Sequence, residues 1–288
     1  MRVVVTGATG FLGQRLIEHL ELNGHEVIGV AGPSGFKGRD EASSSQLWAL
    51  ESPLVDVATK VALFQPEFIL HCANHYIFHH RLSDIELMID ANLRFGLLLL
   101  ESVAGTPTHF INFSSFFQTF DERTLQPNSL YAILKQSFSD VVAWYSSTSL
   151  LSTTDLVLFD VYGLGDLRDR IVPRLFAAAR TGKELTVNSP DALLNLCHVD
   201  DVISAVDLVL RTRTIGRWAL RSRSLITVKE LARMIESITG RCIVSDWGQK
   251  PPHADSSQNK IPTLPGWSPT IELRQRLEDY WNSELRSE

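Results

Sequence analysis

Short apolar runs and longer amphipathic stretches alternate along the first half of the chain. Val3 to Val5 form a β-branched run, and the apolar positions between Phe11 and Leu20 recur at helical spacing. The same alternation predicts further strands over residues 26–30, 47–54, 68–72, 108–113 and 156–159. Because these strands are apolar at nearly every position, both faces of their sheet should be covered by helices. The pattern therefore predicts an α/β fold with a doubly wound parallel sheet.

Capping residues mark where several predicted helices begin and end. Asn23-Gly24 would end the first helix, and Asp84 would cap a long helix that begins at the next residue. Thr227 and Glu230 form a capping box at the start of a helix that ends at Gly240. These signals indicate that helices separate the predicted strands throughout the chain.

The pattern becomes looser after residue 163. Helices are predicted over residues 168–180, 200–210 and 271–285, and short strands over 185–187, 193–197 and 242–246. We therefore expect residues 1–162 to form the main domain, with residues 193–212 returning to it. Residues 163–288 would mainly form a smaller lobe over the ends of the strands.

A glycine-rich turn follows the first predicted strand, with the sequence Gly7-Ala8-Thr9-Gly10-Phe11-Leu12-Gly13. Glycines at this spacing allow a tight turn, a close approach of the backbone to a pyrophosphate, and close packing of the helix on the sheet. The N-terminus of the helix would present free N–H groups and a positive dipole to the phosphates. The turn thus predicts a dinucleotide site, against the alternative of a strand-to-helix turn without a ligand. The residues expected to contact the cofactor here are Gly7, Thr9, Gly10, Phe11 and Leu12.

The composition is that of an ordinary globular protein, with 44% hydrophobic and 21% charged residues among 288. A net charge of −6 gives no basic surface for nucleic acid or an anionic membrane, so we expect a small-molecule partner. The chain opens directly on the first strand, without the segments of a signal peptide, and no apolar run approaches the length that spans a bilayer. The expected location is the cytoplasm.

Neither the cysteines nor the histidines are spaced as a metal site requires. Cys72, Cys197 and Cys242 lie far apart, and we interpret them as buried, reduced thiols. The loop after the fourth strand is rich in histidine, but no carboxylate or cysteine completes a zinc pattern there. We therefore predict neither a disulfide framework nor a metal site. The histidines of this stretch are His71, His75, His79 and His80.

The end of the second predicted strand bears on the choice of cofactor. NAD sites commonly place Asp or Glu there to bind the ribose 2′-hydroxyl, but this chain has Ala31-Gly32-Pro33-Ser34. With Ser34, Lys37 and Arg39 close together, a 2′-phosphate would be accommodated, so NADP is favoured over NAD. The alternative is that residues 32–45 form a solvated polar loop. Asp56, which follows the third strand, is expected to meet the adenine.

Two pairs of polar residues are candidates for chemistry. Tyr131 and Lys135 are four residues apart in a predicted helix, which places them side by side. A lysine cation beside a phenol lowers the pKa of the phenol, so that it exchanges a proton near neutral pH. Ser114 and Ser115 stand at the carboxyl end of a strand, where a hydroxyl would polarise a carbonyl group of the ligand. The alternatives are a surface helix pair and a turn or cap.

In this order, the glycine turn, Asn92, the two serines and the Tyr131/Lys135 pair resemble the short-chain dehydrogenase/reductase superfamily. The segments YGLGD (162–166), HVDDV (198–202) and GWSP (266–269) are similar to its extended branch, the NAD(P)-dependent epimerase/dehydratase family. The stretches FINFSSFF and LYAILKQSF resemble the 4-ketoreductases of deoxysugar pathways that include CDP-abequose synthase. The resemblance covers nearly the whole chain.

The resemblance implies a Rossmann-type sheet with a C-terminal substrate-binding lobe, and a reductase of nucleotide-linked 4-keto-deoxysugars. Tyr131 would donate the proton, and Lys135 would hold the nicotinamide ribose and tune the phenol. Ser115, or else Ser114, would orient the substrate carbonyl. The alternatives are an epimerase or dehydratase that holds NAD tightly, and a non-catalytic NADP-sensing protein on the same fold. The remaining expected cofactor contacts are Asp56, Val57, Cys72, Ala73, Asn74, Asn92, Phe159 and Val161.

Departures from the family pattern bear on the substrate and the reaction. Asn195 stands where family members often carry an arginine that grips a substrate pyrophosphate. A later family arginine has no counterpart in residues 251–257, where Lys250 and His253 are the nearest basic residues. No acidic pair follows the hydroxyl position in residues 114–117, which argues against a dehydratase. The sequence therefore supports the redox chemistry more strongly than it supports a substrate that carries a nucleotide diphosphate.

The resemblance also bears on assembly, because members of this family pair two helices into a four-helix dimer interface. The helices over residues 85–104 and 129–147 carry more apolar surface than one face of a sheet needs. We therefore expect a homodimer. The apolar residues concerned include Leu97 to Leu100, Val141, Val142 and Trp144.

Overall fold

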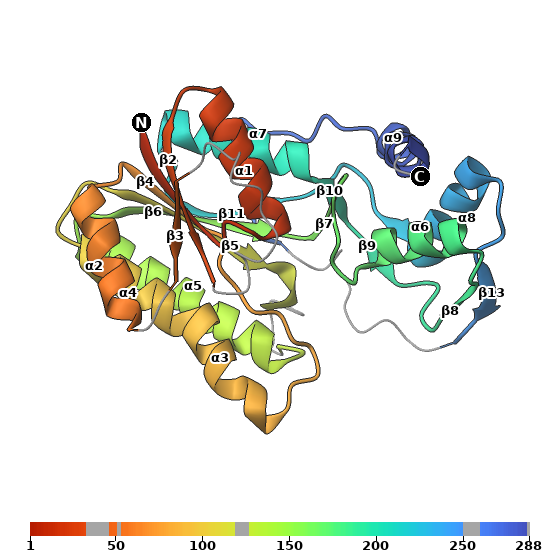
Figure 1. Ribbon diagram of the computed structural model, residues 1–288, viewed down its shortest axis with the longest axis horizontal. Helices are drawn as coiled ribbons and strands as arrows, with labels where there is room; N and C mark the ends of the chain where they lie inside the picture. Colours follow the sequence, from red (N-terminus) through yellow and green to blue (C-terminus); the bar gives the residue numbers. More distant parts are fainter. Residues whose placement is uncertain (33–45, 51–52, 119–126, 250–259, 287–288) are drawn as a thin grey trace.

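The computed structural model describes residues 1–32, 46–50, 53–118, 127–249 and 260–286 of the chain. Its centre is a sheet of seven strands in the order β11-β6-β5-β4-β1-β2-β3, in which neighbouring strands are parallel. Helices lie on both faces of this sheet (Figure 1), so the predicted doubly wound α/β fold is confirmed. The strands are β1 (Arg2–Thr6), β2 (Glu26–Ala31), β3 (Gln46–Ala49), β4 (Phe68–His71), β5 (His109–Ser115), β6 (Ser152–Leu158) and β11 (Gly216–Leu220).

Successive side chains of each strand point to opposite faces, and both faces are buried. Val3 and Val5 of β1 belong to the cluster on the side of α1 and α7, whereas Val4 belongs to the cluster on the side of α2, α4 and α5. This explains why the strands are apolar at nearly every position, since a side chain is covered whichever way it points. The helices named here are α1 (Phe11–Leu22), α7 (Val199–Thr212), α2 (Leu54–Phe64), α4 (Phe95–Val103) and α5 (Leu130–Thr148).

A smaller lobe lies beyond the carboxyl end of β6 (Figure 1). Its apolar residues form a cluster of their own, in which Phe176 of α6 stacks on Tyr280 of α9 with 4.6 Å between the ring centroids. The division of the chain at residue 162 stays a prediction. The elements of the lobe are β7 (Asp160–Tyr162), α6 (Ile171–Thr181), β8 (Leu185–Val187), β9 (Leu193–Leu194), β10 (Leu196–His198), β12 (Ile226–Thr227), α8 (Val228–Thr239), β13 (Val244–Trp247) and α9 (Leu273–Arg286).

The chain returns from this lobe to the main sheet over a longer segment than predicted. The expected return ended at residue 212, but β11 follows α7 and pairs with β6 along Gly216–Leu220. The sequence GRWAL did not indicate a strand, because Gly216 and the charged Arg217 interrupt its apolar pattern. Arg217 of this edge strand lies against β6, with its Nε 3.2 Å from Oδ2 of Asp155.

The third strand is shorter than predicted, and the long helix is interrupted. Gln46–Ala49 pairs with β2, whereas Leu54 already begins α2, so Leu50 and Leu54 do not belong to the predicted strand over residues 47–54. The predicted helix over residues 85–104 consists of α3 (Ile85–Ile89), a π-helical segment (Asp90–Arg94) and α4.

Asp84 occupies the predicted N-cap position of α3, but its side chain makes no capping hydrogen bond there. It is the last residue of a short 3₁₀ helix, η2 (Leu82–Asp84), and its side chain accepts no hydrogen bond from the first turn of α3. Its carboxylate accepts the N–H of Arg81 instead, at 2.7 Å. The acidic side chain therefore caps the 3₁₀ turn that precedes α3, and not α3 itself.

The three cysteines are free thiols, and Cys197 is buried. Cys242 is exposed, contrary to the prediction, and it lies in the segment between α8 and β13 and not within a strand. Cys72 is half-buried at the end of β4. No helix in the described part of the chain has both the length and the apolar character needed to cross a membrane.

Candidate active site

The carboxyl ends of β1 and β4 lie side by side, where the order of the strands in the sheet reverses. Gly7 directly follows β1 and has a φ of 65°, and a Cβ at this position would lie 2.7 Å from the backbone nitrogen of Ala73. A Cβ on Gly13 would collide with the carbonyl oxygen of Gly7. The first and third glycines thus permit the turn and the close packing of α1, as the sequence predicted. Gly10, at the N-cap of α1, donates its N–H to the Gly7 carbonyl at 2.9 Å.

Buried hydrogen bonds join the ends of these two strands. Nδ1 of His71 lies 2.9 Å from Oγ1 of Thr6, and the same oxygen accepts the N–H of Ala73 at 3.1 Å. Burial lowers the pKa of His71 to about 3, helped by the charge of Lys135, so the imidazole is neutral. These contacts fix Cys72 and Ala73, two of the expected cofactor contacts, against the glycine turn.

Asn92 holds the loop that follows β4. It is 2% exposed and lies in the π-helical segment. Its Oδ1 accepts the N–H of His75 at 2.9 Å, and its Nδ2 donates to the carbonyl of His75 at 2.9 Å. Both polar atoms of the amide are therefore used to shape this loop, in which Asn74 donates to the carbonyl of Cys72 at 3.3 Å. The expected contact between Asn92 and a cofactor stays a prediction.

The residues expected to bind the adenosine end of the cofactor are only partly described. Ser34, Lys37 and Arg39 lie outside the described residues. Asp56 and Val57 stand in the first turn of α2, where Asp56 is exposed and Val57 is buried. The predicted third strand would have run to Leu54, but α2 begins at that residue. Asp56 therefore lies in the first turn of a helix and not directly after a strand.

Tyr131 and Lys135 lie one turn apart on α5, as predicted, but both are buried and not on the protein surface. Burial raises the pKa of Tyr131 to about 12, although the nearby charges of Arg170 and Arg168 favour its ionisation. The predicted lowering of this pKa is therefore wrong, because loss of solvent outweighs the positive charges nearby. Burial also lowers the pKa of Lys135 to about 8.

The two candidate serines lie on opposite faces of β5. Ser114 alternates with Phe110, which packs on the side of α4 and α5, whereas Ser115 alternates with Phe113, which packs on the side of α1 and α7. The Ser114 side chain is buried, and its Oγ has no hydrogen-bond partner among the described residues. Oγ of Ser115 accepts the N–H of Phe117 at 3.3 Å. Strand geometry therefore places Ser114 on the side of α5. The sequence had favoured Ser115 for this role.

Phe159 and Val161 follow the carboxyl end of β6. Phe159 is buried and stacks on Phe116, with 5.2 Å between the ring centroids and an interplanar angle of 5°. The carbonyl of Val161 accepts a hydrogen bond from Nη2 of Arg168 at 2.8 Å. Because the Arg168 guanidinium also lies 4.7 Å from the ring centroid of Phe11, it links this segment to the start of α1.

Sequence reasoning missed two residues beside the candidate phenol. The ring of Tyr76 packs edge-on against Tyr131, with 4.9 Å between the centroids. The Arg170 guanidinium lies 4.1 Å from the Tyr76 ring centroid, on the segment that precedes α6. The signal available in the sequence was weak, namely a tyrosine in the histidine-rich loop and two arginines shortly after the YGLGD segment.

Asn195, which stands in place of a family arginine, has a structural partner. It is buried, and its Oδ1 accepts the N–H of Ser222 at 2.8 Å. The backbone N–H of Asn195 donates to Oδ2 of Asp160 at 3.3 Å, which ties β7 to β10. Lys250 and His253 lie outside the described residues. Within the described residues, no group of three or more His, Cys, Asp or Glu side chains is placed to hold a metal ion.

Comparisons with known proteins add to this geometry. The model of the NAD dependent epimerase/dehydratase family matches residues 3–217. CDP-abequose synthase of Salmonella typhimurium is 22% identical over 96% of each chain. The dTDP-4-dehydro-6-deoxy-D-allose reductase of Streptomyces bikiniensis is 22% identical over 83% of this chain and 81% of its own. The UDP-glucuronic acid 4-epimerase of Bacillus cereus, solved with UDP-glucuronic acid and NAD, shares the fold with a TM-score of 0.83 at 22% identity, over 99% of this chain and 100% of that chain.

Proposed function

Because the chain belongs to the NAD-dependent epimerase/dehydratase family, we propose that it is an NAD(P)-dependent ketoreductase that acts on a nucleotide-linked 4-keto-deoxysugar. The observation that carries the proposal is the buried pair Tyr131 and Lys135, one turn apart on the helix that packs over β5 and β6. Two relatives that align over most of the chain are named as a CDP-abequose synthase and a deoxysugar reductase, which supports reduction.

The glycine turn fits the pyrophosphate of a dinucleotide. The first helical hydrogen bond of α1 runs from the N–H of Gln14 to the carbonyl of Gly10, at 3.0 Å. The N–H groups of Phe11 and Leu12 precede it, so they are oriented toward the strand ends and would donate to the phosphates. A side chain at Gly7 would disturb this arrangement, because its Cβ would press on the backbone after β4. When bound, the cofactor supplies the hydride.

The chain itself supplies the proton and the orientation of the substrate. The pKa of Tyr131, at about 12, keeps the phenol protonated at neutral pH, so it would donate its proton to the substrate oxygen. Lys135 would bind the nicotinamide ribose, and Ser114 would donate a hydrogen bond to the carbonyl. Arg170 brings a positive charge to the Tyr131 side of the site, where it would attract a substrate diphosphate, whereas Asn195 offers no charge in place of the family arginine.

The second candidate is an epimerase that regenerates its own NAD, since the structural neighbour from Bacillus cereus is a 4-epimerase. The two candidates differ in cofactor balance. A reductase oxidises one NADPH for each keto sugar it reduces, whereas an epimerase interconverts sugars with no net change in the cofactor. Absorbance of NADPH, followed together with chromatography of candidate nucleotide sugars, distinguishes them. Interconversion without cofactor oxidation would replace the reductase proposal, and binding without turnover of any sugar would favour a sensor.

We expect NADPH to bind more tightly than NADH. β2 ends at Ala31 without an acidic side chain to hold a ribose 2′-hydroxyl, and Ser34, Lys37 and Arg39 follow it in the sequence. Fluorescence titration with both cofactors measures the preference, and the Lys37→Ala/Arg39→Ala variant should lose it. Equal affinities in the wild type, or tighter binding of NADH, would contradict the assignment.

We also propose a homodimer formed by the outer surfaces of α4 and α5. Some of the apolar residues expected at this interface are not on the outer surface, because Leu99, Leu100 and Val142 face the core. Trp144 is 58% exposed and Ile133 is 46% exposed, so α5 still presents apolar surface to solvent. Light scattering at micromolar concentration should give twice the chain mass, and Trp144→Glu should give the monomer mass. A wild-type monomer would contradict the proposal.

A further inference from the structure

A fully buried glutamine side chain lies directly after β5. Gln118 is the last residue of the short 3₁₀ helix η4 (Phe116–Gln118), which follows the strand without a gap. Because this turn is tight, the side chain reaches back to its own strand, where its Oε1 accepts the N–H of Ser115 at 2.8 Å. Ser115 is the last residue of β5. The glutamine therefore fixes the backbone next to the candidate hydroxyl of Ser114.

The nitrogen of the same amide is bonded to α5. Nε2 of Gln118 donates to Oγ of Ser139 at 3.1 Å, and Ser139 is itself buried. We call these two hydrogen bonds, to the N–H of Ser115 and to the hydroxyl of Ser139, the Gln118 bridge. Ser139 lies two turns after Tyr131 on α5. Because a regularly hydrogen-bonded helix moves as one piece over two turns, the bridge also bears on where Tyr131 stands.

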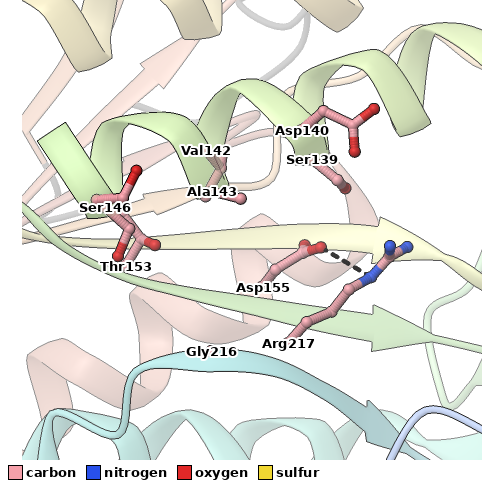
Figure 2. Close-up of a pocket in the computed structure, with 10 residues that line it drawn as sticks. Ser139, Asp140, Val142, Ala143, Ser146, Thr153, Asp155, Gly216 and Arg217 are labelled. Atoms are coloured by element: carbon pink, nitrogen blue, oxygen red, sulfur yellow. Dashed lines mark ion pairs between the residues drawn. The ribbon is translucent and has the colours of Figure 1, made fainter.

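A guanidinium from the edge strand β11 helps to orient the amide. Nη2 of Arg217 donates to Oε1 of Gln118 at 3.4 Å. Arg217 and Ser139 line the same cavity of about 320 Å³, in which Figure 2 shows Arg217 paired with Asp155. Since Ser115 and Arg217 both offer N–H donors, the amide oxygen must face them, and the amide nitrogen must face the hydroxyl of Ser139. Contacts from three elements therefore hold the amide in one orientation.

An apolar contact joins β5 and α5 on the same side of the sheet. Phe110 lies on the face of β5 that carries Ser114, because the two are four residues apart. Its ring packs edge-on against Phe138 of α5, the residue before Ser139, with 6.3 Å between the centroids. Apolar contacts have little directional preference, whereas hydrogen bonds require a defined angle and distance. Gln118 therefore supplies a directional link that the two rings do not.

We propose that Gln118 is a positioning residue that holds the end of β5 at a fixed spacing from α5, so that the Ser114 hydroxyl and the Tyr131 phenol meet the same substrate carbonyl. The proposal rests on the proposed reductase function, in which both groups bind that oxygen. Oγ of Ser114 is buried and has no hydrogen-bond partner among the described residues, as expected of a hydroxyl that awaits a ligand. A displacement of about 1 Å can lower a rate about 100-fold, so loss of the bridge should be visible in kcat.

The Gln118 bridge can be tested without substrate or cofactor. Ser139→Ala removes only the bond to α5 and leaves the N–H of Ser115 beside the glutamine. If the amide is held from both sides, this variant should raise the hydrogen-exchange rate of the Ser115 amide by about fivefold, the usual effect of one hydrogen bond. Ser137→Ala is the matched control, because Oγ of Ser137 donates within α5, to the carbonyl of Ile133 at 3.0 Å. It should leave the exchange rate of Ser115, measured by NMR, unchanged.

A double-mutant cycle on kcat tests the positioning role. Gln118→Met nearly keeps the side-chain volume and removes both bonds of the bridge, so it should lower kcat by about 10- to 100-fold. Ser114→Ala should lower kcat by about 100-fold, as loss of a donor to the reacting oxygen does. In the Ser114→Ala background the carbonyl meets Tyr131 alone, so Gln118→Met should add less than about threefold. A glutamine that served only packing would give the same factor in both backgrounds.

Gln136→Met is the matched control for the cycle. Gln136 is a half-buried glutamine of α5, and its Oε1 accepts a hydrogen bond from Nη1 of Arg217 at 3.5 Å. The variant therefore takes a glutamine from the same guanidinium without cutting the Gln118 bridge. It should change kcat by less than about threefold, as expected for a substitution away from the site.

Equal factors for Gln118→Met in both backgrounds, or an unchanged exchange rate of Ser115 in Ser139→Ala, would overturn the proposal. If Gln118→Met does not fold, Ser139→Ala takes its place in the cycle, because it breaks the same bridge at its other end. If a nucleotide sugar is reduced but these variants keep the wild-type kcat, the positioning role fails and the proposed function stands. If no nucleotide sugar is reduced, the proposed function and the positioning role both fail, whereas faster exchange in Ser139→Ala would still establish the bridge.

Discussion

Tyr131→Phe is expected to lower kcat by about 100- to 10,000-fold, the usual size of a general-acid contribution. The variant removes only the hydroxyl and keeps the ring, which packs edge-on against Tyr76. Its affinity for NADPH should therefore change little. Steady-state kinetics at saturating NADPH, together with a fluorescence titration of the cofactor, separate the two effects.

Tyr76→Phe is the matched control for this prediction, since it removes the neighbouring phenol from a ring that is 36% exposed. It should change kcat by less than about threefold, as expected for a substitution outside the chemistry. Because burial raises the pKa of Tyr131 to about 12, the rate should not fall through ionisation of this phenol between neutral pH and about pH 10. A Tyr131→Phe enzyme that keeps more than about a tenth of the wild-type turnover would exclude Tyr131 as the proton donor.

Much of the fold was predictable because its signals are local. The capping box works within one helical turn, and the structure contains it, with the N–H of Glu230 donating to Oγ1 of Thr227 at 3.1 Å and the Thr227 N–H donating to Glu230 at 2.8 Å. α8 then ends at Gly240, as the sequence predicted, and this glycine takes the left-handed conformation. The apolar strands were likewise recognisable, because a sheet covered on both faces needs apolar residues at successive positions.

The parts of the site that depend on distant pairing were not predictable. Asp155 precedes the predicted strand over residues 156–159, and its partner Arg217 stands on a strand that the apolar pattern did not reveal. Their contact exists because β6 and β11 pair, which no local pattern reports. The register of β5 had to be observed before Ser114 could be assigned to the side of α5, because a shift of one residue would place Ser115 on that side instead.

The pKa shifts of Tyr131 and Lys135 could likewise not be predicted without the structure. Helical spacing correctly indicated that the two residues share a face, and from this we expected a lowered pKa for the phenol. Both side chains proved to be buried, and loss of solvent disfavours the charged form of each. Sequence spacing reports neighbours along a helix, but it does not report how much solvent the fold removes from them.

Lys135→Met is expected to weaken NADPH binding by about 10- to 100-fold, the loss that follows removal of a charged hydrogen-bond donor. It should also lower kcat, because the cofactor would be held less firmly beside the substrate. Methionine keeps the apolar stem of a side chain that is 3% exposed, so the loss should not come from a cavity. This combined effect differs from that of Tyr131→Phe, which should reduce turnover alone.

The contrast between the two variants tests their roles and not merely their importance. Lys60→Met is the matched control, because Lys60 is an exposed lysine on α2 whose ammonium lies 4.3 Å from the ring centroid of Trp48. It should change neither the affinity for NADPH nor kcat. If Lys135→Met binds NADPH as tightly as the wild type, the ammonium does not hold the ribose. A loss of turnover in that variant would then mean that Lys135 acts on the proton transfer from Tyr131, which a shifted pH dependence of kcat would reveal.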